Sequence, residues 1–351
     1  LLFKIIYGKI IYNKDNLQSQ NIEISELDNK NIINFFNKKY KIYKIINGRI
    51  YTDNVENVAI IENNKIVDNI SYQQISGNLV SAENNICIKK GTPRLKKKIK
   101  GRILSLSQGA SGHSNYGHWL FDILPKLKLY SEIYKFKNLN YLYLNKPKEW
   151  QFKSLEVLGL DKIEIIDSEK YRHVQADEVI CTDHPSYYKG YILEQSKYLP
   201  DWIVKWLRET YLNFEKKFDC NDKIFIDRTS INSKHCQFIN ENEISELLIS
   251  KGFKKYKTEN LDFFQEIYLF HNASYVFGAH GAGFANLTFC KKNTKVVEIR
   301  PENNTNTIYS RLSDINNLNY KLIESPIVKE ADRTKGDIFV DLNKLEKIIE
   351  L

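Results

Sequence analysis

Alternating strand and helix patterns, arranged in two series, constrain the fold of this 351-residue chain more than any other feature. Such alternation is typical of βαβ units, in which helices join parallel strands and cover the sheet that the strands form. The first series starts at residue 101. Its expected strands are 101–109, 140–146, 162–167 and 176–183, and its expected helices are 118–134, bent near Pro125, and 150–160.

A long amphipathic helix pattern at 198–218 ends in the turn-rich "DCND", where we place a domain junction. The second series follows. Its expected strands are 223–228, 253–258, 274–281 and 294–301, and its expected helices are 240–253, 262–273 and 282–289. The two series predict an α/β fold of two Rossmann-like domains that face each other across a cleft.

Four segments follow from these patterns. Residues 1–100 form short β-rich pieces, which we interpret as the N-terminal part of the first domain. The first Rossmann-like domain is expected at 101–205 and the second at 206–325. The remaining segment, 326–351, ends in a helix with Leu342, Leu345 and Ile349 on one face, which we expect to pack back on the first domain.

The formal charge of +9 favours an anionic partner only weakly, because Ile, Asn, Lys and Tyr are over-used together, as an AT-rich coding sequence would produce. We expect no nucleic-acid partner. The basic run at 94–102 is interpreted as a solvated loop, with a surface for anionic lipid or polyanionic glycan as the alternative.

The location of the protein is inferred from its cysteines and from its hydropathy. Five scattered cysteines without a C-x-x-C pair indicate reduced thiols. No stretch is apolar enough to predict a membrane span, and no signal pattern opens the chain. We therefore expect a cytoplasmic protein, at most peripheral to a membrane. Because the chain contains no Met, we expect its native start to lie upstream.

The segment "FGAHGAGFAN", residues 277–286, follows an apolar run as a strand, a turn and a helix start. Glycines at 278, 281 and 283 would let a ligand reach backbone N–H groups, and a helix opening near Ala282 would add its positive dipole end. This pattern predicts a phosphate-binding turn. The alternative is a close helix-to-sheet crossing, with His280 and Asn286 as capping or packing residues.

Two further groups have side chains suited to a catalytic site. His118 and Asp122 lie four residues apart, hence on one helical face, and a carboxylate beside an imidazole orients it or tunes a general base. Asn115 could cap that helix. Arg228 emerges where the strand "KIFIDR" ends and is suited to phosphate oxygens. Surface ion pairs are the alternative for both groups.

Taken together, these motifs resemble glycosyltransferase family 61. The resemblance covers roughly residues 100–302. The motifs that carry it are N-x-x-H-W-x-x-D at 115–122, "IDRTS" at 226–230, "INENEI" at 239–244, the glycine segment within 270–286, and "VVEIRP" at 296–301. Many members have an R-R pair before the N-E motif, whereas this chain has Lys234 and His235 there, so its donor preference could differ.

The resemblance implies a GT-B fold and an inverting, metal-independent transfer from a nucleotide sugar, with a UDP-sugar as the favoured donor, to a glycan acceptor. It implies no cofactor and a role in capsule or lipopolysaccharide assembly. The first domain would bind the acceptor and the second the donor. Asp122 is the expected base, with His118 orienting it or replacing it.

The remaining residues take roles by the same resemblance. Asn115 and Trp119 would lie on the acceptor side. Thr229, Lys234, Glu241 and Glu298 would be further donor contacts, although Glu298 could equally be structural. The diphosphate would be held by Arg228, Gly278, His280, Gly281, Ala282, Gly283 and Asn286.

Two other classes of function stay open at the level of sequence. A metal-dependent hydrolase could use His113, His118 and His280, but these histidines lack the close spacing of metal ligands. A non-catalytic protein that binds glycans or polyanions could retain the two-domain shell. Keeping both the His118–Asp122 pair and the glycine segment argues against it. The oligomeric state is not predicted.

Overall fold

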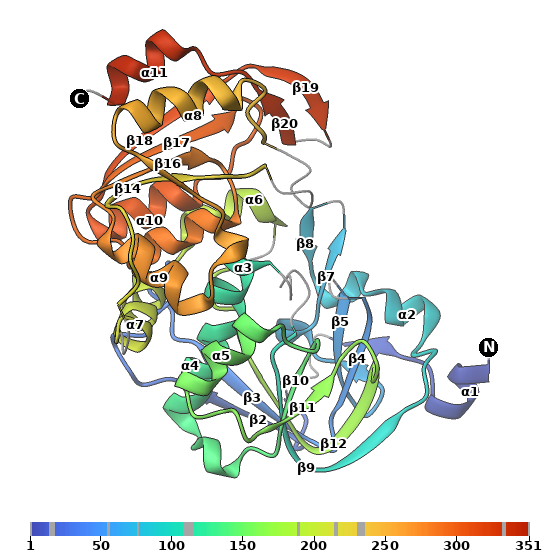
Figure 1. The fold of residues 1–351 in the computed structure, drawn as a ribbon. Coiled ribbons are helices and arrows are strands. Elements are labelled where there is room, and N and C mark those ends of the chain that lie inside the picture. The colour runs from blue at the N-terminus through green and yellow to red at the C-terminus, as the bar shows by residue number, and fades with distance from the viewer. Residues whose placement is uncertain are drawn as a thin grey trace. The chain divides into compact units, whose positions relative to one another are not determined.

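The computed structural model describes residues 2–13, 18–54, 57–75, 77–107, 115–187, 190–213, 217–229, 236–331 and 335–349. The chain divides into two compact units, Leu1–Ile203 and Val204–Leu351, called the first and second unit below (Figure 1). Each is a mixture of helices and strands, so the predicted α/β class is confirmed. The GT-B arrangement of two domains stays a prediction.

The first unit is built on one large mixed sheet. Four strands at one side of it, in the order β11-β10-β9-β12, are parallel. They are β9 (Lys97–Ser105), β10 (Tyr141–Leu144), β11 (Glu164–Asp167) and β12 (His173–Thr182). The helices that connect or follow them are α3 (Tyr116–His118), the π-helical turn η4 (Trp119–Ile123), α4 (Leu124–Ile133), α5 (Glu149–Val157) and α6 (Ile192–Gln195). Helix α7 (Asp201–Tyr211) contains the boundary between the two units.

The β-rich start of the chain joins the same sheet. Strands β3 and β4 both pair antiparallel with β12, so the N-terminal strands continue the parallel part without a break. The N-terminal strands are β1 (Ile11–Tyr12), β2 (Ile22–Glu26), β3 (Lys41–Ile46), β4 (Arg49–Asn54), β5 (Asn57–Glu62), β6 (Lys65–Ile66), β7 (Tyr72–Ile75) and β8 (Asn78–Val80), with β13 (Gly190–Tyr191) beside β8. Short helices α1 (Leu2–Tyr7) and α2 (Ile86–Lys90) complete this part.

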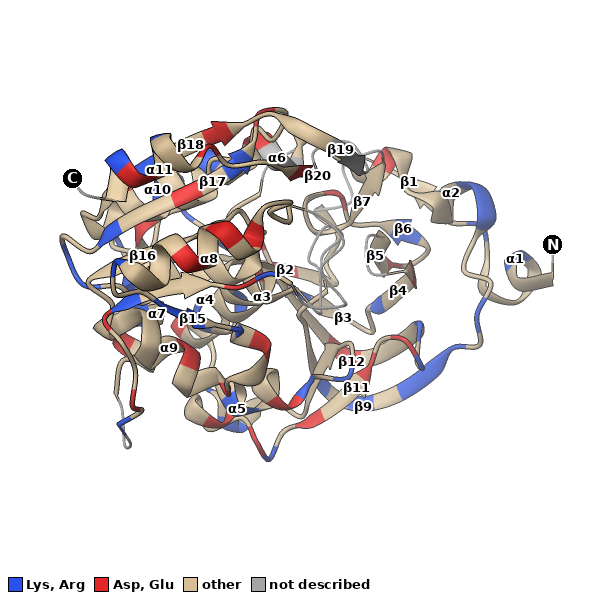
Figure 2. Ribbon diagram, turned by 45° about the horizontal axis from the view of Figure 1, so that its top comes forward, with Lys and Arg blue, Asp and Glu red and all other residues tan. Residues whose placement is uncertain are grey.

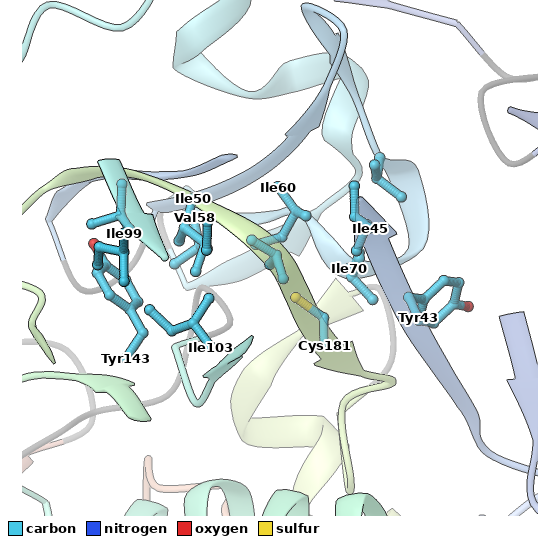
Figure 3. Packing of buried hydrophobic residues seen from close by; sticks show 14 of the residues in the cluster. Tyr43, Ile45, Ile50, Val58, Ile60, Ile70, Ile99, Ile103, Tyr143 and Cys181 are labelled. Atoms are coloured by element: carbon cyan, nitrogen blue, oxygen red, sulfur yellow. The ribbon is translucent and has the colours of Figure 1, made fainter. Parts of the chain in front are cut away.

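Apolar side chains from both parts of this sheet form one core. Figure 3 shows Ile45, Ile50 and Ile60 of the N-terminal strands packed in a cluster with Ile103 of β9 and Cys181 of β12. Burial of β-branched side chains stabilises a sheet by roughly 25 cal/mol for each Å² of apolar surface removed from water. The β-rich segment is therefore a structural part of the first unit.

The basic run at 94–102 forms most of β9 instead of the expected loop (Figure 2). Within this run Ile99 is buried, while Lys97 lies over the ring of Tyr171, 3.8 Å from the ring centre. Arg102 pairs with Glu178 at 2.5 Å. The density of lysines favoured a loop in the sequence, whereas pairing with β12 makes residues 97–102 part of a strand.

The second unit contains a parallel sheet of five strands in the order β15-β14-β16-β17-β18. Helices α8 and α11 cover one face, and α9, η8 and α10 lie on the other (Figure 1). The strands are β14 (Lys223–Ile226), β15 (Lys254–Tyr256), β16 (Tyr275–Ala279), β17 (Lys295–Pro301) and β18 (Asn319–Ser325), with a separate hairpin of β19 (Ile327–Ala331) and β20 (Lys335–Ile338). The helices are α8 (Glu241–Ser250), α9 (Phe263–Asn272), the 3₁₀ helix η8 (Ala282–Phe289), α10 (Ile308–Asn316) and α11 (Leu342–Ile349).

The terminal helix α11 packs within the second unit, and the expected packing on the first domain stays a prediction. It contacts α8, and its buried residues Leu345 and Ile349 belong to the core of the second unit with Ile244 and Phe277. The apolar face of α11 was recognised correctly, but a face alone does not specify which sheet it covers. None of the helices in the described ranges is long and apolar enough to span a membrane.

Candidate active site

The helix that carries His118 and Asp122 begins with a side-chain cap and then widens. The Asn115 side chain accepts a hydrogen bond from the His118 N–H at 3.2 Å, as the sequence predicted for a cap. The next turn, Trp119–Ile123, is π-helical, with the Leu124 N–H donating to the Trp119 carbonyl. Pro125 explains the irregularity, because it has no N–H and its ring crowds the preceding turn. Such π turns are frequent at functional sites.

His118 and Asp122 form a close pair within this widened turn. His118 Nδ1 lies 2.6 Å from Asp122 Oδ2. The other oxygen of Asp122 accepts a hydrogen bond from the Ser186 hydroxyl at 2.8 Å. Asp122 is 1% exposed, whereas the His118 side chain is 29% exposed. A substrate can therefore approach the imidazole more easily than the carboxylate.

The protonation of this pair follows from its contacts. Burial alone would raise the pKa of Asp122, but the hydrogen bond and charge of His118, with His184 and Ser186, outweigh burial and lower that pKa. The carboxylate is therefore ionised at neutral pH. An anion at Nδ1 keeps the proton on that nitrogen and leaves Nε2 of a neutral imidazole as an acceptor. This arrangement suits His118 as a general base that Asp122 orients.

The loop after β12 completes this site and was missed in the sequence. His184 is buried, and burial lowers its pKa to about 3, so the ring is neutral. Its Nδ1 accepts the backbone N–H groups of Ser186 at 3.3 Å and Tyr187 at 2.9 Å, which brings Ser186 to Asp122. The signal was present: "HPSYY" follows a buried strand of a parallel sheet, where sites are commonly built.

The sequence analysis expected Trp119 on the acceptor side, but the structure buries this residue. It is 1% exposed and its indole N–H donates to Ser154 at 2.9 Å. Trp150 packs edge-on against it, with ring centres 6.0 Å apart. Trp119 therefore anchors the helix to α5 and contributes stability rather than contact with a substrate.

In the second unit a pocket opens where strand ends meet. Its volume is about 150 Å³. The order β15-β14-β16 shows that the chain runs first to one side of β14 and then to the other, so a topological switch point lies between β14 and β16. Ligands of such sheets bind outside the carboxyl ends of the strands at this point. The pocket is lined by Ile226, Asp227, Arg228, Thr258, Glu259, Ala279, Gly281, Ala282, Gly283 and Phe284.

A side chain at each of the three glycines of this segment would meet different surroundings. A Cβ on Gly281 would overlap the guanidinium of Arg228, which donates to the His280 carbonyl. A Cβ on Gly278 would come within 2.8 Å of Phe284 and 3.3 Å of the Ile226 carbonyl oxygen, so Gly278 permits close packing. A Cβ on Gly283 would meet nothing closer than Thr258 at 3.4 Å and would project into the pocket. Close packing thus accounts for Gly278, and the phosphate-binding interpretation stays a prediction for Gly281 and Gly283.

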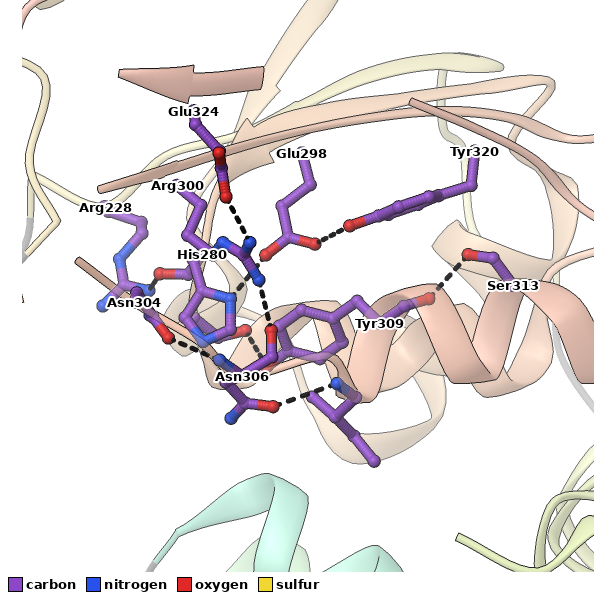
Figure 4. A network of polar contacts seen from close by, with 12 residues as sticks. Arg228, His280, Glu298, Arg300, Asn304, Asn306, Tyr309, Ser313, Tyr320 and Glu324 are labelled. Carbon is purple, nitrogen blue, oxygen red and sulfur yellow. Dashed lines mark hydrogen bonds and ion pairs between the residues drawn. The ribbon is translucent and has the colours of Figure 1, made fainter. Parts of the chain in front are cut away.

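Two residues of the segment point inward. Asn286 is 0% exposed, and its amide donates to Glu266 at 2.9 Å and to the Gly283 carbonyl at 3.3 Å. It therefore holds the turn, whereas the sequence analysis expected it to contact a diphosphate. His280 pairs through Nδ1 with buried Glu298, which also accepts a hydrogen bond from Tyr320 at 2.5 Å (Figure 4). His280 is not among the described residues that line the pocket.

Three of the four expected further donor contacts have partners within the protein, and their contact with a donor stays a prediction. Thr229 donates both its N–H and its hydroxyl to Asp227, at 2.7 Å each. Glu241 pairs with Lys255 at 2.5 Å, and Glu298 holds His280. Lys234 and His235 lie outside the described residues, as does His113. Within the described ranges no group of three His, Cys, Asp or Glu residues could hold a metal ion.

The charged residues that line the pocket are Asp227, Arg228 and Glu259. Burial lowers the pKa of Arg228, but from its ordinary value above 12 the guanidinium stays charged. Burial would raise the pKa of Asp227, but the hydrogen bonds of Thr229, with Lys255 and Lys257 nearby, outweigh it and lower that pKa. The Tyr309 hydroxyl donates to the Gly281 carbonyl at 2.5 Å and fixes the turn. A held guanidinium beside the N–H groups that open η8 is suited to an anion.

Comparison with known proteins identifies the family of the chain. No curated protein matches the chain. The family model of glycosyltransferase 61 matches residues 116–297, just over half of the chain. The match includes the His118–Asp122 pair, Arg228 and the glycine turn. The chain therefore belongs to glycosyltransferase family 61.

Proposed function

We propose that the protein transfers a sugar from a nucleotide sugar to a glycan acceptor with inversion at the anomeric carbon and without a metal ion. The family gives the glycosyltransferase class. The observation that carries the donor assignment is the pocket at the switch point of the second unit, where Arg228 and the start of η8 offer cationic and N–H groups. These groups suit the diphosphate that leaves when the glycosidic bond breaks.

In the proposed reaction, an acceptor hydroxyl oxygen bonds to the anomeric carbon as the bond from that carbon to the phosphate oxygen breaks. The hydroxyl proton passes to Nε2 of His118, and Asp122 stabilises the imidazolium that forms. The electron pair leaves with the nucleoside diphosphate, whose added charge meets Arg228. Assignment of the base to His118, in place of Asp122, is supported by the burial of the carboxylate.

The biological setting is proposed more broadly. A UDP-sugar is the favoured donor and an acceptor in capsule or lipopolysaccharide assembly the favoured setting, because the motifs resemble those of bacterial members. A cytoplasmic protein, at most peripheral to the membrane, is part of the same proposal. None of these assignments changes the chemistry that the two sites can perform.

Calorimetric titration with UDP, GDP, CMP and ADP, each with and without EDTA, tests the donor site. We expect one nucleotide to bind with micromolar affinity in EDTA. Arg228→Ala should weaken it at least about tenfold, as expected when a charge-assisted hydrogen bond is lost. Gly281→Ala should act similarly by displacing Arg228.

Gly278→Ala is unsuitable as a control because it would disturb packing, whereas an exposed change such as Glu243→Gln on α8 should leave affinity unchanged. Binding that disappears in EDTA would contradict metal independence. If no nucleotide binds, the pocket is a consequence of packing, and the glycan-binding alternative takes precedence.

A further inference from the structure

The pocket of the second unit has two chemically different walls. Arg228 and the turn at Gly281–Gly283 form the first, at the ends of β14 and β16. Thr258 and Glu259 form the second, in the segment that follows β15. Glu259 is exposed, and within the described residues its carboxylate has neither an ion pair nor a side-chain hydrogen bond. A cation thus faces a carboxylate across an open space.

This charge pattern restricts what the pocket can hold. A phosphate is attracted to Arg228 and repelled by Glu259, so Glu259 should meet a neutral part of the same ligand. A carboxylate accepts two hydrogen bonds, which matches a pair of neighbouring hydroxyl groups. The required ligand therefore carries a phosphate group close to a vicinal diol.

The sheet order identifies which diol this is. β15 is the second strand of the unit and lies beside the first, β14. In nucleotide-binding sheets of doubly wound type, an acidic side chain after the second strand binds the ribose hydroxyls. Here the glycine turn follows the third strand, β16, and Arg228 follows the first, so the phosphate site is assembled on both sides of the switch point.

The dimensions of the pocket are consistent with a phosphate and a ribose in contact. Only 3.4 Å separates Thr258 Oγ1 from the position that a Cβ on Gly283 would occupy. A volume of about 150 Å³ is below the roughly 300–1,000 Å³ of pockets that enclose a drug-sized ligand. The pocket can thus hold a diphosphate and the edge of one ribose, with the rest of the nucleotide outside.

We propose that Glu259, assisted by Thr258, binds the 2′- and 3′-hydroxyl groups of the donor's ribose and makes the enzyme selective for ribonucleotides over 2′-deoxyribonucleotides. This inference rests on the proposed function, because it places the nucleoside diphosphate of the donor in this pocket. Glu259 acts in binding and takes no part in the chemical step.

Calorimetry with matched ligand pairs tests the inference. The probes are UDP and 2′-deoxy-UDP, GDP and 2′-deoxy-GDP, and inorganic pyrophosphate. The natural chain should prefer the ribose form of its nucleotide by about tenfold to 100-fold, as hydrogen bonds to a charged group predict. Glu259→Gln should lose most of this preference, by weakening binding of the ribose form. Its affinity for pyrophosphate should stay the same or increase.

Glu243→Gln, an exposed acidic position on α8, serves as the matched control and should leave both affinities unchanged. A ribose preference that persists in Glu259→Gln, or a natural chain that binds both forms equally, would overturn the assignment of Glu259 while the proposed function stands. Absence of binding by every nucleotide and by pyrophosphate would instead contradict the donor pocket itself. The two failures are therefore distinguishable.

Discussion

Each unit contains a histidine paired through Nδ1 with a buried carboxylate, yet the two pairs are arranged for different tasks. His118 and Asp122 come from one helix, and Ser186 supports the carboxylate. His280 directly follows β16, Glu298 lies in the neighbouring strand β17, and Tyr320 supports the carboxylate.

The surroundings of the two histidines separate their roles. The His118 side chain is 29% exposed, in keeping with a group that meets a substrate. The His280 side chain is 12% exposed and lies beside the ring of Tyr309, while its carbonyl accepts a hydrogen bond from Arg228. The same chemical pair thus suits proton transfer in the first unit and the holding of a turn in the second. Composition of a site alone does not indicate its task.

The largest expected effect tests the first pair. His118→Gln should lower turnover by about 100- to 10,000-fold, the usual contribution of a general base, while nucleotide affinity stays unchanged. Asp122→Asn should lower turnover as well, because the amide no longer stabilises an imidazolium. Release of nucleoside diphosphate from the nucleotide sugar, measured at saturating donor, gives the turnover.

Ser186→Ala is the matched control for this pair, because it removes the other hydrogen bond of Asp122 and leaves His118 in place. Its turnover should fall much less. If His118→Gln keeps its turnover while Asp122→Asn loses it, the carboxylate is the base, and the comparison between the two pairs no longer holds in this form.

A smaller effect is expected for the second pair, and it concerns nucleotide affinity instead of turnover. Glu298→Gln should weaken nucleotide binding about tenfold, the equivalent of one charge-assisted hydrogen bond, because the turn that seats Arg228 loosens. Turnover at saturating donor should change little. Tyr320→Phe removes the second partner of Glu298 and should give a weaker form of the same result. A loss of turnover with unchanged affinity would make His280 a catalytic residue.

The contrast also explains what the sequence could predict. The His118–Asp122 pair lies within one helix, so spacing of four residues was sufficient to find it. Four strands of the second unit, β14 to β17, were predicted because apolar runs alternate with amphipathic helices, whereas β18, β19 and β20 were not predicted. By contrast, the His280–Glu298 contact depends on strand register, Ser186 reaches Asp122 across 64 residues, and Glu259 enters the pocket through sheet order. Contacts that depend on tertiary packing leave no periodic signal in one sequence.

The last comparison concerns the pH dependence of stability, and it separates the units by sign. Burial lowers the pKa of Lys126 in the first unit to about 7, with Asp122 and Cys181 opposing the shift. The unfolded chain, with an ordinary lysine pKa of about 10.4, then binds more protons than the folded chain above pH 7. Stability of the first unit should therefore rise from pH 7 to about 10, by at most about 1.4 kcal/mol per pH unit.

Burial has the opposite consequence for a carboxyl group in the second unit. It raises the pKa of Glu266 to about 8, with Asn286 opposing the shift and Glu259 and Asp262 adding to it. The folded chain then binds more protons than the unfolded chain above the ordinary glutamate pKa of about 4.3. Stability of the second unit should therefore fall as pH rises from about 4.3 to 8, with the same limiting slope.

Hydrogen exchange followed by mass spectrometry can measure both slopes, because it reports the free energy of opening for each unit separately. Lys126→Met should remove the rise in the first unit, and Glu266→Gln should remove the fall in the second while keeping a partner for Asn286. Each variant is the control for the other, since neither should change the slope of the unit in which it does not lie. If both slopes change together in either variant, the two units open as one cooperative body. Each unit would then not have a stability of its own, and this part of the comparison would not hold.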